Sequence, residues 1–222
     1  MAKPNRIILV RHGESEGNID RAVYSRIADH KVELTENGKK QAVKVGEEIS
    51  YNVSNPLTNN LGVYISPYKR TRETWKWIKY GIKQTFPIKI AWEKEDPRIR
   101  EQEWISPPYH DLFDKEVIDD IFEHREFDRF WFRMPYGESG ADVYDRITTF
   151  LDTMHRDFQK KDSPENILII THGITLRIFL MRWFHWTTEE FNAYKNPKNC
   201  QHIIMELQNN SKYRITKGLD PR

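Results

Sequence analysis

Short aliphatic runs that alternate with helical patterns constrain the fold of this 222-residue chain more than any other feature. Four runs are typical of strands: Arg6–Val10, Leu61–Ile65, Ile88–Trp92 and Ile167–Thr171. The first and the fourth are continuously aliphatic, which indicates parallel strands buried on both faces of a sheet. Alternating strands and helices predict an α/β fold that binds its ligand beyond the carboxyl ends of the strands.

Helix signals separate these runs. Apolar spacing and capping residues predict helices over Thr35–Ser50, over Arg72–Tyr80 after an N-cap at Ser66, after the cap Ser139, over Gly173–Phe184 and after Thr187. Near the C-terminus, Cys200–Leu207 and Lys212–Thr216 flank a pair of asparagines and indicate an edge hairpin. We therefore expect three layers, in which helices flank a doubly wound, mostly parallel sheet on both faces.

A chain of this length fits one domain, so we expect a single domain over residues 1–222. Residues 101–136 interrupt the alternation, and we expect them to form an insertion with a helix near Asp111–His124. Ten acidic and two basic residues lie between Glu101 and Asp128. Such an insertion is either a solvated acidic helix with an apolar underside or a helical lid that shapes the substrate pocket.

The composition argues against several classes of protein. The formal net charge of +2 gives no electrostatic case for nucleic-acid binding. No apolar run approaches the ~20 residues that span a bilayer, and no secretory signal precedes the first strand. The single cysteine, Cys200, leaves no internal disulfide and is expected to be a small buried residue. We therefore expect a cytoplasmic protein without nucleic-acid or integral membrane contacts.

Histidine and arginine follow three of the predicted strands at one edge of the sheet. Arg11-His12-Gly13-Glu14-Ser15 follows the first strand, Ser66–Thr74 with Arg70 follows the second, and Thr171-His172-Gly173 ends the last. Neighbouring cationic side chains repel each other unless an anion lies between them, and glycine lets backbone donors approach a ligand. A helix that begins after His172 also directs partial positive charge at this edge. The sequence therefore predicts a phosphate-binding site.

The same motifs carry a family resemblance that covers nearly the whole chain. Leu9–Glu14, Ser66–Thr74 and Thr171–Gly173 are similar to signature elements of the histidine phosphatase superfamily, in its phosphoglycerate-mutase-like branch. Arg100–Gln102, Phe132–Ser139 and Phe179–Phe184 further resemble a eukaryotic subgroup of phosphoglycerate-mutase-like proteins and broad-range acid phosphatases. The resemblance implies a doubly wound α/β fold, a phosphohistidine intermediate, and no metal or other cofactor.

Carried over position by position, the resemblance assigns a role to each candidate residue. His12 would be the nucleophile, and His172 would flank the phosphoryl group on its other side. Arg11 and Arg70 would clamp the phosphate, with further contacts from Asn18 and Gly173. Glu101 would protonate the leaving group and later activate water, because an alkoxide leaves poorly. Fixed positive donors stabilise the charge of a phosphoryl transition state.

Three further residues are assigned supporting roles: Ser15, Glu138 and Ser139. Ser139 is expected to cap a helix. Glu138 either holds one of the catalytic groups by a hydrogen bond or serves as the proton donor in place of Glu101. An ion pair with Arg100 is the structural alternative for Glu101. The other histidines show no spacing typical of a zinc site.

These features together predict a phosphomonoesterase that acts through phosphohistidine on small molecules, with a broad range and an acidic pH optimum. The acidic insertion and the absence of an evident second basic cluster favour singly phosphorylated substrates. Two alternatives stay open: a phosphotransferase of the cofactor-dependent phosphoglycerate mutase type, and a catalytically weak protein that binds phosphorylated ligands or acts in trafficking. The chain is expected to act as a monomer or a homodimer.

Overall fold

Six strands form one mixed sheet in the computed structural model, which describes residues 3–53, 60–86, 88–104, 115–127 and 129–222. The strands are β1 (Arg6–Arg11), β2 (Asn60–Ile65), β3 (Lys89–Glu95), β4 (Asn166–Thr171), β5 (His202–Leu207) and β6 (Tyr213–Lys217). Their order in the sheet is β3-β2-β4-β1-β5-β6. The first four strands along the chain pair in parallel, whereas β5 pairs antiparallel with both β1 and β6.

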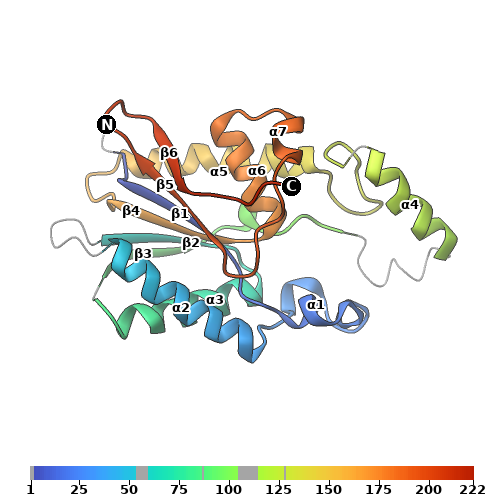
Figure 1. The fold of residues 1–222 in the computed structure, drawn as a ribbon, viewed down its shortest axis with the longest axis horizontal. Helices are drawn as coiled ribbons and strands as arrows, with labels where there is room; N and C mark the ends of the chain where they lie inside the picture. Colours follow the sequence, from blue (N-terminus) through green and yellow to red (C-terminus); the bar gives the residue numbers. More distant parts are fainter. Residues whose placement is uncertain (1–2, 54–59, 87, 105–114, 128) are drawn as a thin grey trace.

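Helices cover both faces of this sheet, which gives the three layers that the sequence predicts (Figure 1). They are α1 (Glu16–Ile19), α2 (Glu36–Val53), α3 (Lys69–Lys83), α4 (Lys115–Phe127), α5 (Gly140–Phe158), α6 (Gly173–Phe184) and α7 (Thr188–Asn192). Helices α2 and α3 lie on one face, and α5 and α6 lie on the other. None of the helices in the described parts of the chain is long and apolar enough to cross a membrane.

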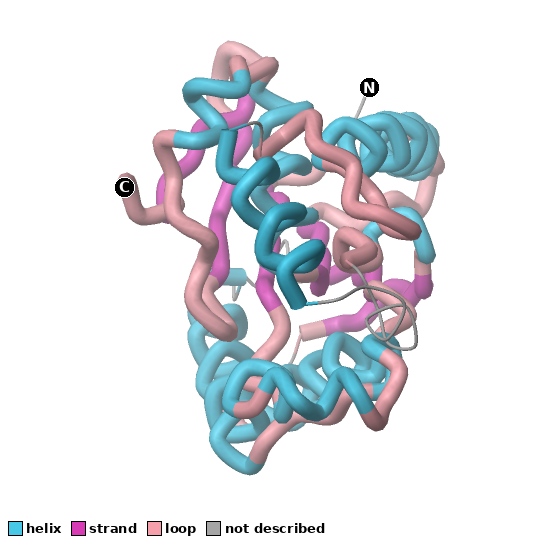
Figure 2. The backbone as a smooth tube through the Cα atoms, turned by 90° about the vertical axis from the view of Figure 1, so that its right-hand side faces the viewer, coloured by secondary structure: helices cyan, strands magenta, loops and turns pink. Residues whose placement is uncertain are grey.

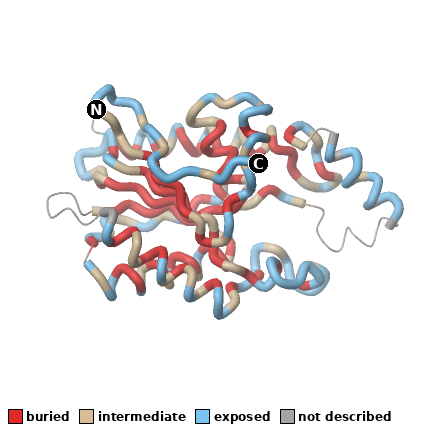
Figure 3. The backbone as a smooth tube through the Cα atoms, in the orientation of Figure 1, coloured by how far each residue is buried: buried red, intermediate tan, exposed pale blue. Residues whose placement is uncertain are grey.

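The two faces of the sheet bury two separate apolar cores (Figure 3). Side chains alternate between the faces along a strand, so Ile7 and Leu9 of β1 face α5 and α6, while Ile8 and Val10 face α2 and α3. All four side chains are fully buried. The middle of β1 is therefore apolar on both faces, as expected for a strand covered by helices on both sides, and polar residues stand at its ends.

The sequence-based expectations for the main elements are confirmed, with shifts of a few residues at their ends. The expected strand Ile88–Trp92 is Lys89–Glu95, and the expected C-terminal hairpin is β5 and β6. Ser139 caps α5 by accepting a hydrogen bond from the backbone of Asp142. The prediction that Ser66 caps the next helix is wrong, because α3 begins at Lys69 with Tyr68 as its N-cap.

Helix α4 lies beyond the carboxyl ends of the parallel strands, away from both cores (Figures 1 and 2). It spans Lys115–Phe127, whereas the expectation was Asp111–His124, and residues 105–114 lie outside the described part of the chain. Its acidic side chains face solvent, as expected. Two of its apolar side chains, Val117 and Phe122, are also exposed.

Candidate phosphoryl-transfer site

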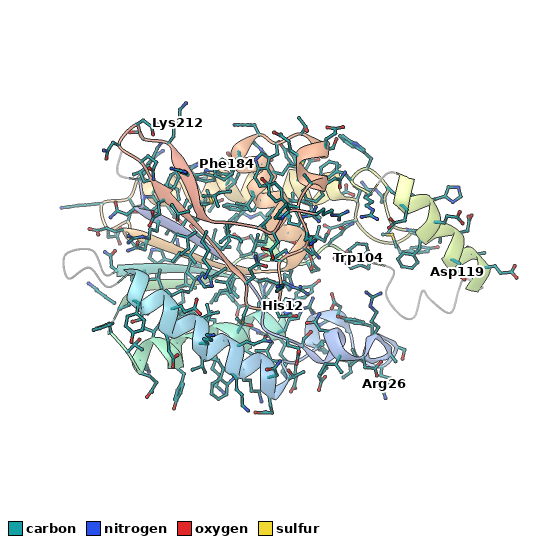
Figure 4. The ribbon with its side chains drawn as sticks, viewed as in Figure 1. His12, Arg26, Trp104, Asp119, Phe184 and Lys212 are labelled. Carbon is teal, nitrogen blue, oxygen red and sulfur yellow. The ribbon has the colours of Figure 1, made fainter. Side chains whose placement is uncertain are left out.

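The candidate residues follow the carboxyl ends of β1, β2 and β4, where His12 lies (Figure 4). His12 follows β1 directly, and His172 is the N-cap residue between β4 and α6. Their imidazole rings meet edge to face, with centroids 5.2 Å apart and planes at 61°. Two residues separated by most of the chain are thus in contact, because β1 and β4 are adjacent parallel strands.

His12 is buried and presents one free ring nitrogen. Its Nδ1 donates a hydrogen bond to the carbonyl oxygen of Gly13 at 2.7 Å, and a carbonyl oxygen only accepts. Burial and the charges of Arg70 and Arg11 hold the pKa of His12 well below its usual range. The neutral ring therefore carries its proton on Nδ1 and leaves the Nε2 lone pair available for attack.

Gly13 lets this turn form against a neighbouring loop. A Cβ atom at this position would lie 2.6 Å from the carbonyl oxygen of Gly38, so a larger residue would displace the backbone. The Gly13 amide donates to Thr74 Oγ1 at 3.0 Å, which ties the turn to α3. The glycine is therefore required for close backbone packing beside His12.

His172 is fully buried between His12, Tyr68 and Ser66. Ser66 Oγ lies 2.8 Å from His172 Nε2, at hydrogen-bond distance. The Nδ1 atom of His172 is buried and has no hydrogen-bond partner among the described residues. Burial, followed by the charge of Arg70, lowers the pKa of His172 well below its usual range. The serine that the sequence suggested as a helix cap is thus a contact of the second histidine.

Arg70 enters the site from the first turn of α3, and only 3% of its surface is exposed. Its Nη1 donates to the carbonyl oxygen of Asp29 at 2.7 Å and to Asp29 Oδ1 at 2.8 Å. The guanidinium also lies over the ring of Tyr68, 4.9 Å from its centroid. Its Nε is buried and has no partner among the described residues.

Arg11, the last residue of β1, is the second guanidinium of the site. Its Nη1 donates to the carbonyl oxygen of Pro197 at 2.6 Å, while its buried Nε has no partner among the described residues. Burial lowers the pKa of Arg11, and the positive charge of Arg70 adds to this effect. Two neighbouring guanidinium groups with unused buried donors suit the binding of an oxyanion.

Glu101 supplies a carboxyl group at the same site. Burial is the largest influence and raises its pKa, while Arg70 and Arg11 oppose this shift. Its Oε1 accepts hydrogen bonds from the amide of Gln102 at 3.0 Å and from Thr175 Oγ1 at 3.3 Å. A carboxyl group whose pKa is raised by burial stays protonated to higher pH, as a general acid requires.

Glu138, the alternative proton donor, is engaged elsewhere. Arg146 donates to both of its carboxylate oxygens at 3.0 Å, Arg100 donates to Oε1 at 2.5 Å, and the amide of Glu103 donates to Oε2 at 3.1 Å. These contacts fix an ionised carboxylate that ties α5 to the segment carrying Glu101. Arg100 is thus paired with Glu138 and Glu103, not with Glu101.

The remaining candidates lie around this centre. Asn18 Oδ1 accepts hydrogen bonds from Ser15 N, Ser15 Oγ and Asn199 Nδ2 at 2.9–3.1 Å. The amide nitrogen of Asn18 can therefore serve as a hydrogen-bond donor to a ligand. Gly173 begins α6, and a Cβ atom there would lie 2.9 Å from the Asn196 side chain. Within the described residues, no three His, Cys, Asp or Glu side chains form a group suited to hold a metal ion.

The sequence-based predictions do not include Asp29 among the site residues, and they assign Ser66 the role of a helix cap. Asp29 lies in a region without helical or strand periodicity, and only the folded chain brings it to Arg70. A Ser-Pro pair before a helix matches a capping signature, so the local pattern pointed away from the contact of Ser66 with His172. In neither case does a sequence signal identify the partner.

The sheet carries a buried cluster of two histidines and two arginines at the carboxyl ends of its parallel strands, an arrangement that suits an oxyanion. The chain belongs to the histidine phosphatase superfamily (branch 1), whose model matches residues 7–217. Membership makes the chain an enzyme of the phosphatase class, as its sequence predicts.

Individual relatives agree with this membership. The chain is 40% identical to phosphoglycerate mutase-like protein AT74H of Arabidopsis thaliana, over 95% of its own length and 76% of that protein. It is 28% identical to the broad-range acid phosphatase DET1 of Saccharomyces cerevisiae, over 100% and 91% of the two chains. The solved structure of YhfR from Bacillus stearothermophilus shares the fold, with a TM-score of 0.66 at 20% identity over 96% and 95% of the chains.

Proposed function

We propose that this protein is a metal-independent phosphomonoesterase that works through a phosphohistidine on His12. The observation that carries the proposal is a cluster of buried nitrogens: His12, whose Nδ1 is bonded to the Gly13 carbonyl, packs against the ring of His172. Three buried donors of the site have no hydrogen-bond partner among the described residues, namely Arg11 Nε, Arg70 Nε and His172 Nδ1. Such donors stabilise the charge on the three equatorial oxygens of a phosphoryl group in transfer. Asn18 and the N-terminus of α6 at Gly173 add neutral donors.

The proposed reaction has two steps. In the first, the His12 Nε2 lone pair attacks phosphorus, a P–N bond forms, the ester P–O bond breaks, and the leaving oxygen takes the proton of Glu101. In the second, water attacks the phosphohistidine, Glu101 takes a proton from that water, and the P–N bond breaks to release inorganic phosphate. His172 holds the transferred group by donating from Nδ1, with the Ser66 hydroxyl donating to Nε2.

The pKa shifts support an acidic optimum. Because the pKa of Glu101 is raised, the acid form persists above its usual range and is lost as pH rises through the raised value. Because the pKa of His12 is lowered, the nucleophile stays neutral as pH falls. The window in which the acid is protonated and the nucleophile is neutral therefore lies on the acid side of the raised pKa of Glu101.

The substrate side of the proposal is a broad range of small phosphomonoesters. A relative named as a broad-range acid phosphatase, similar over the whole chain, supports this range. We include in the proposal a single domain in which residues 101–136, with α4, shape the mouth of the site. The chain supplies all the candidate groups itself, so the proposal needs only a monomer and also allows a homodimer.

We also propose a cytoplasmic location, because the one cysteine of the chain is buried and free, as suits a reducing compartment.

Acid-quenched labelling tests this function. Wild type is mixed with a phosphomonoester labelled in its phosphoryl group, and an acid-labile phosphoenzyme is expected within one turnover. His12→Ala should abolish the label and turnover, whereas the exposed His155→Ala on α5 should retain both. Retained phospholigand binding without label or turnover would indicate a binding protein. Transfer to an added acceptor in preference to water would indicate a mutase-type phosphotransferase.

A further inference from the structure

A second group of arginines lines an inner cavity of about 160 Å³ beside α6. Arg129, Arg177 and Arg222 contribute to its wall, and no acidic side chain is among the described residues that line it. An outer cavity of about 450 Å³ lies next to it and shares Arg129 and Arg222 in its wall. The outer volume lies within the range of about 300–1,000 Å³ that is typical of small-molecule sites.

Arg177 is the most buried of the three arginines and has no carboxylate partner among the described residues. Only 3% of its surface is exposed, its Nη2 donates to the carbonyl oxygen of Phe191 at 2.6 Å, and its guanidinium lies 4.0 Å from the centroid of the Phe191 ring. Its buried Nε has no hydrogen-bond partner among the described residues. A buried, unpaired cation is costly, and a bound anion would offset that cost.

The other two arginines increase the positive potential at Arg177. Burial lowers the pKa of Arg177 to about 10, and the charges of Arg222 and Arg129 contribute to the shift. Arg129 is paired with Glu126, and Glu189 also lines the outer cavity. Among the described residues that line the inner cavity, by contrast, all the charged side chains are arginines.

The inner cavity adjoins the candidate catalytic site without including its catalytic residues. Gln102, which follows Glu101, and Ile174, which follows Gly173, line the inner cavity. Asn196, which lies against Gly173, is part of the same wall. An anion held by Arg177 would thus lie behind the residues that carry the proposed acid and the N-terminus of α6.

We propose that Arg129, Arg177 and Arg222 form a second oxyanion-binding site, separate from the phosphoryl site at His12. Its ligand is a carboxylate or phosphate group, since a guanidinium fork matches the oxygens of either. That group is either a second anionic group of the substrate or a separate small anion. No single stretch of the sequence displays this cluster, because its members come from positions before α5, within α6 and at residue 222.

Counting bound phosphate tests the site directly. Equilibrium dialysis of the full chain with inorganic phosphate across the millimolar range should give two phosphates per wild-type chain. Arg70→Gln should remove the phosphate at the catalytic site and leave one. The affinity for the other phosphate should fall by about tenfold or more in each of three variants, Arg177→Gln, Arg129→Gln and Arg222→Gln. This is the loss expected when a charge-assisted hydrogen bond is removed. As a control, substitution of the exposed Arg214 on β6 (Arg214→Gln) should leave the binding of both phosphates unchanged.

A second measurement identifies the source of the anion. Turnover of 4-carboxyphenyl phosphate is compared with turnover of phenyl phosphate in wild type and in Arg222→Gln. A substrate-borne anion predicts that the variant loses catalytic efficiency only with the carboxylate substrate. If the site binds a separate anion, Arg222→Gln should change the catalytic efficiency with the two substrates equally. Added phosphate should then have a noncompetitive effect on the turnover of phenyl phosphate in wild type, and Arg222→Gln should remove that effect.

The two phosphates are counted independently, so the catalytic proposal and this one fail separately. A single phosphate in wild type that Arg70→Gln removes would overturn the second site and leave the catalytic proposal standing. Two phosphates that are insensitive to all three arginine variants would also overturn it. Arg129 and Arg222 are less buried than Arg177, so their variants keep the test decisive if Arg177→Gln fails to fold.

Discussion

Asp29 holds the guanidinium of Arg70 from both its backbone and its side chain, with Nη1 2.7 Å from the carbonyl oxygen and 2.8 Å from Oδ1. The carboxylate therefore orients an arginine of the proposed phosphate site and also offsets its charge. It also raises the pKa of Glu101, since a nearby negative charge disfavours ionisation. One acidic residue outside the recognised motifs thus acts on two groups of the site.

Asp29→Asn should change both properties. The amide oxygen can still accept from Arg70, but the competing negative charge is lost, so inorganic phosphate should inhibit about two- to fivefold more strongly, the range expected for a partly exposed ion pair. The pKa of Glu101 should fall, which moves the alkaline limb of the kcat/KM profile to lower pH. Unchanged inhibition together with an unchanged profile would show that Asp29 does not act on the site.

The pH profile depends on Glu101. Wild-type kcat/KM should fall as pH rises through the raised pKa of this carboxyl, because the acid form is then lost. Glu101→Gln should remove that limb and lower kcat by about 10²–10⁴-fold for alkyl phosphates. The loss should be smaller for 4-nitrophenyl phosphate, whose leaving group needs no proton. An equal loss for both substrates would argue against proton donation by Glu101.

Glu138→Ala should affect stability more than chemistry. Its carboxylate is buried between Arg146 and Arg100, and removing one partner of a buried ion pair costs about 3–5 kcal/mol. At about 2–4 °C per kcal/mol for a chain of this size, Tm should fall by about 6–20 °C. The pH profile of the folded variant should keep its alkaline limb. A lost limb with an unchanged Tm would reverse the roles of Glu138 and Glu101.

Ser66→Ala should expose the role of the hydroxyl beside His172. In the proposed mechanism, the Ser66 hydroxyl donates to Nε2 of His172 at 2.8 Å and so keeps the ring proton on Nδ1. Without that contact, kcat should fall by about tenfold with KM less affected. Nitrogen NMR of His172 should show a mixture of tautomers in the variant and one tautomer in wild type. Ser163→Ala, on the loop before β4, is the control. A single unchanged tautomer in Ser66→Ala would remove Ser66 from the mechanism.

Much of the fold follows from local sequence, since the aliphatic run Ile167–Thr171 has only one environment that suits it, a strand covered on both faces. The positions of His12 and His172 follow from the same logic, because residues after adjacent parallel strands meet at one edge. The contact of Asp29 with Arg70 depends on how a loop packs against a helix, and no periodic pattern records that packing. The cluster around Arg177 is hidden for the same reason: its members lie far apart in the chain.

The position of the phosphoryl group on the enzyme tests the central claim most directly. Trapped phosphoenzyme is digested under alkaline conditions, and the modified peptide is identified by mass spectrometry and phosphorus NMR. Because Nδ1 of His12 is bonded to the Gly13 carbonyl, we predict phosphate on Nε2 of His12. Phosphate on His172, on a serine, or on Nδ1 of His12 would contradict the account.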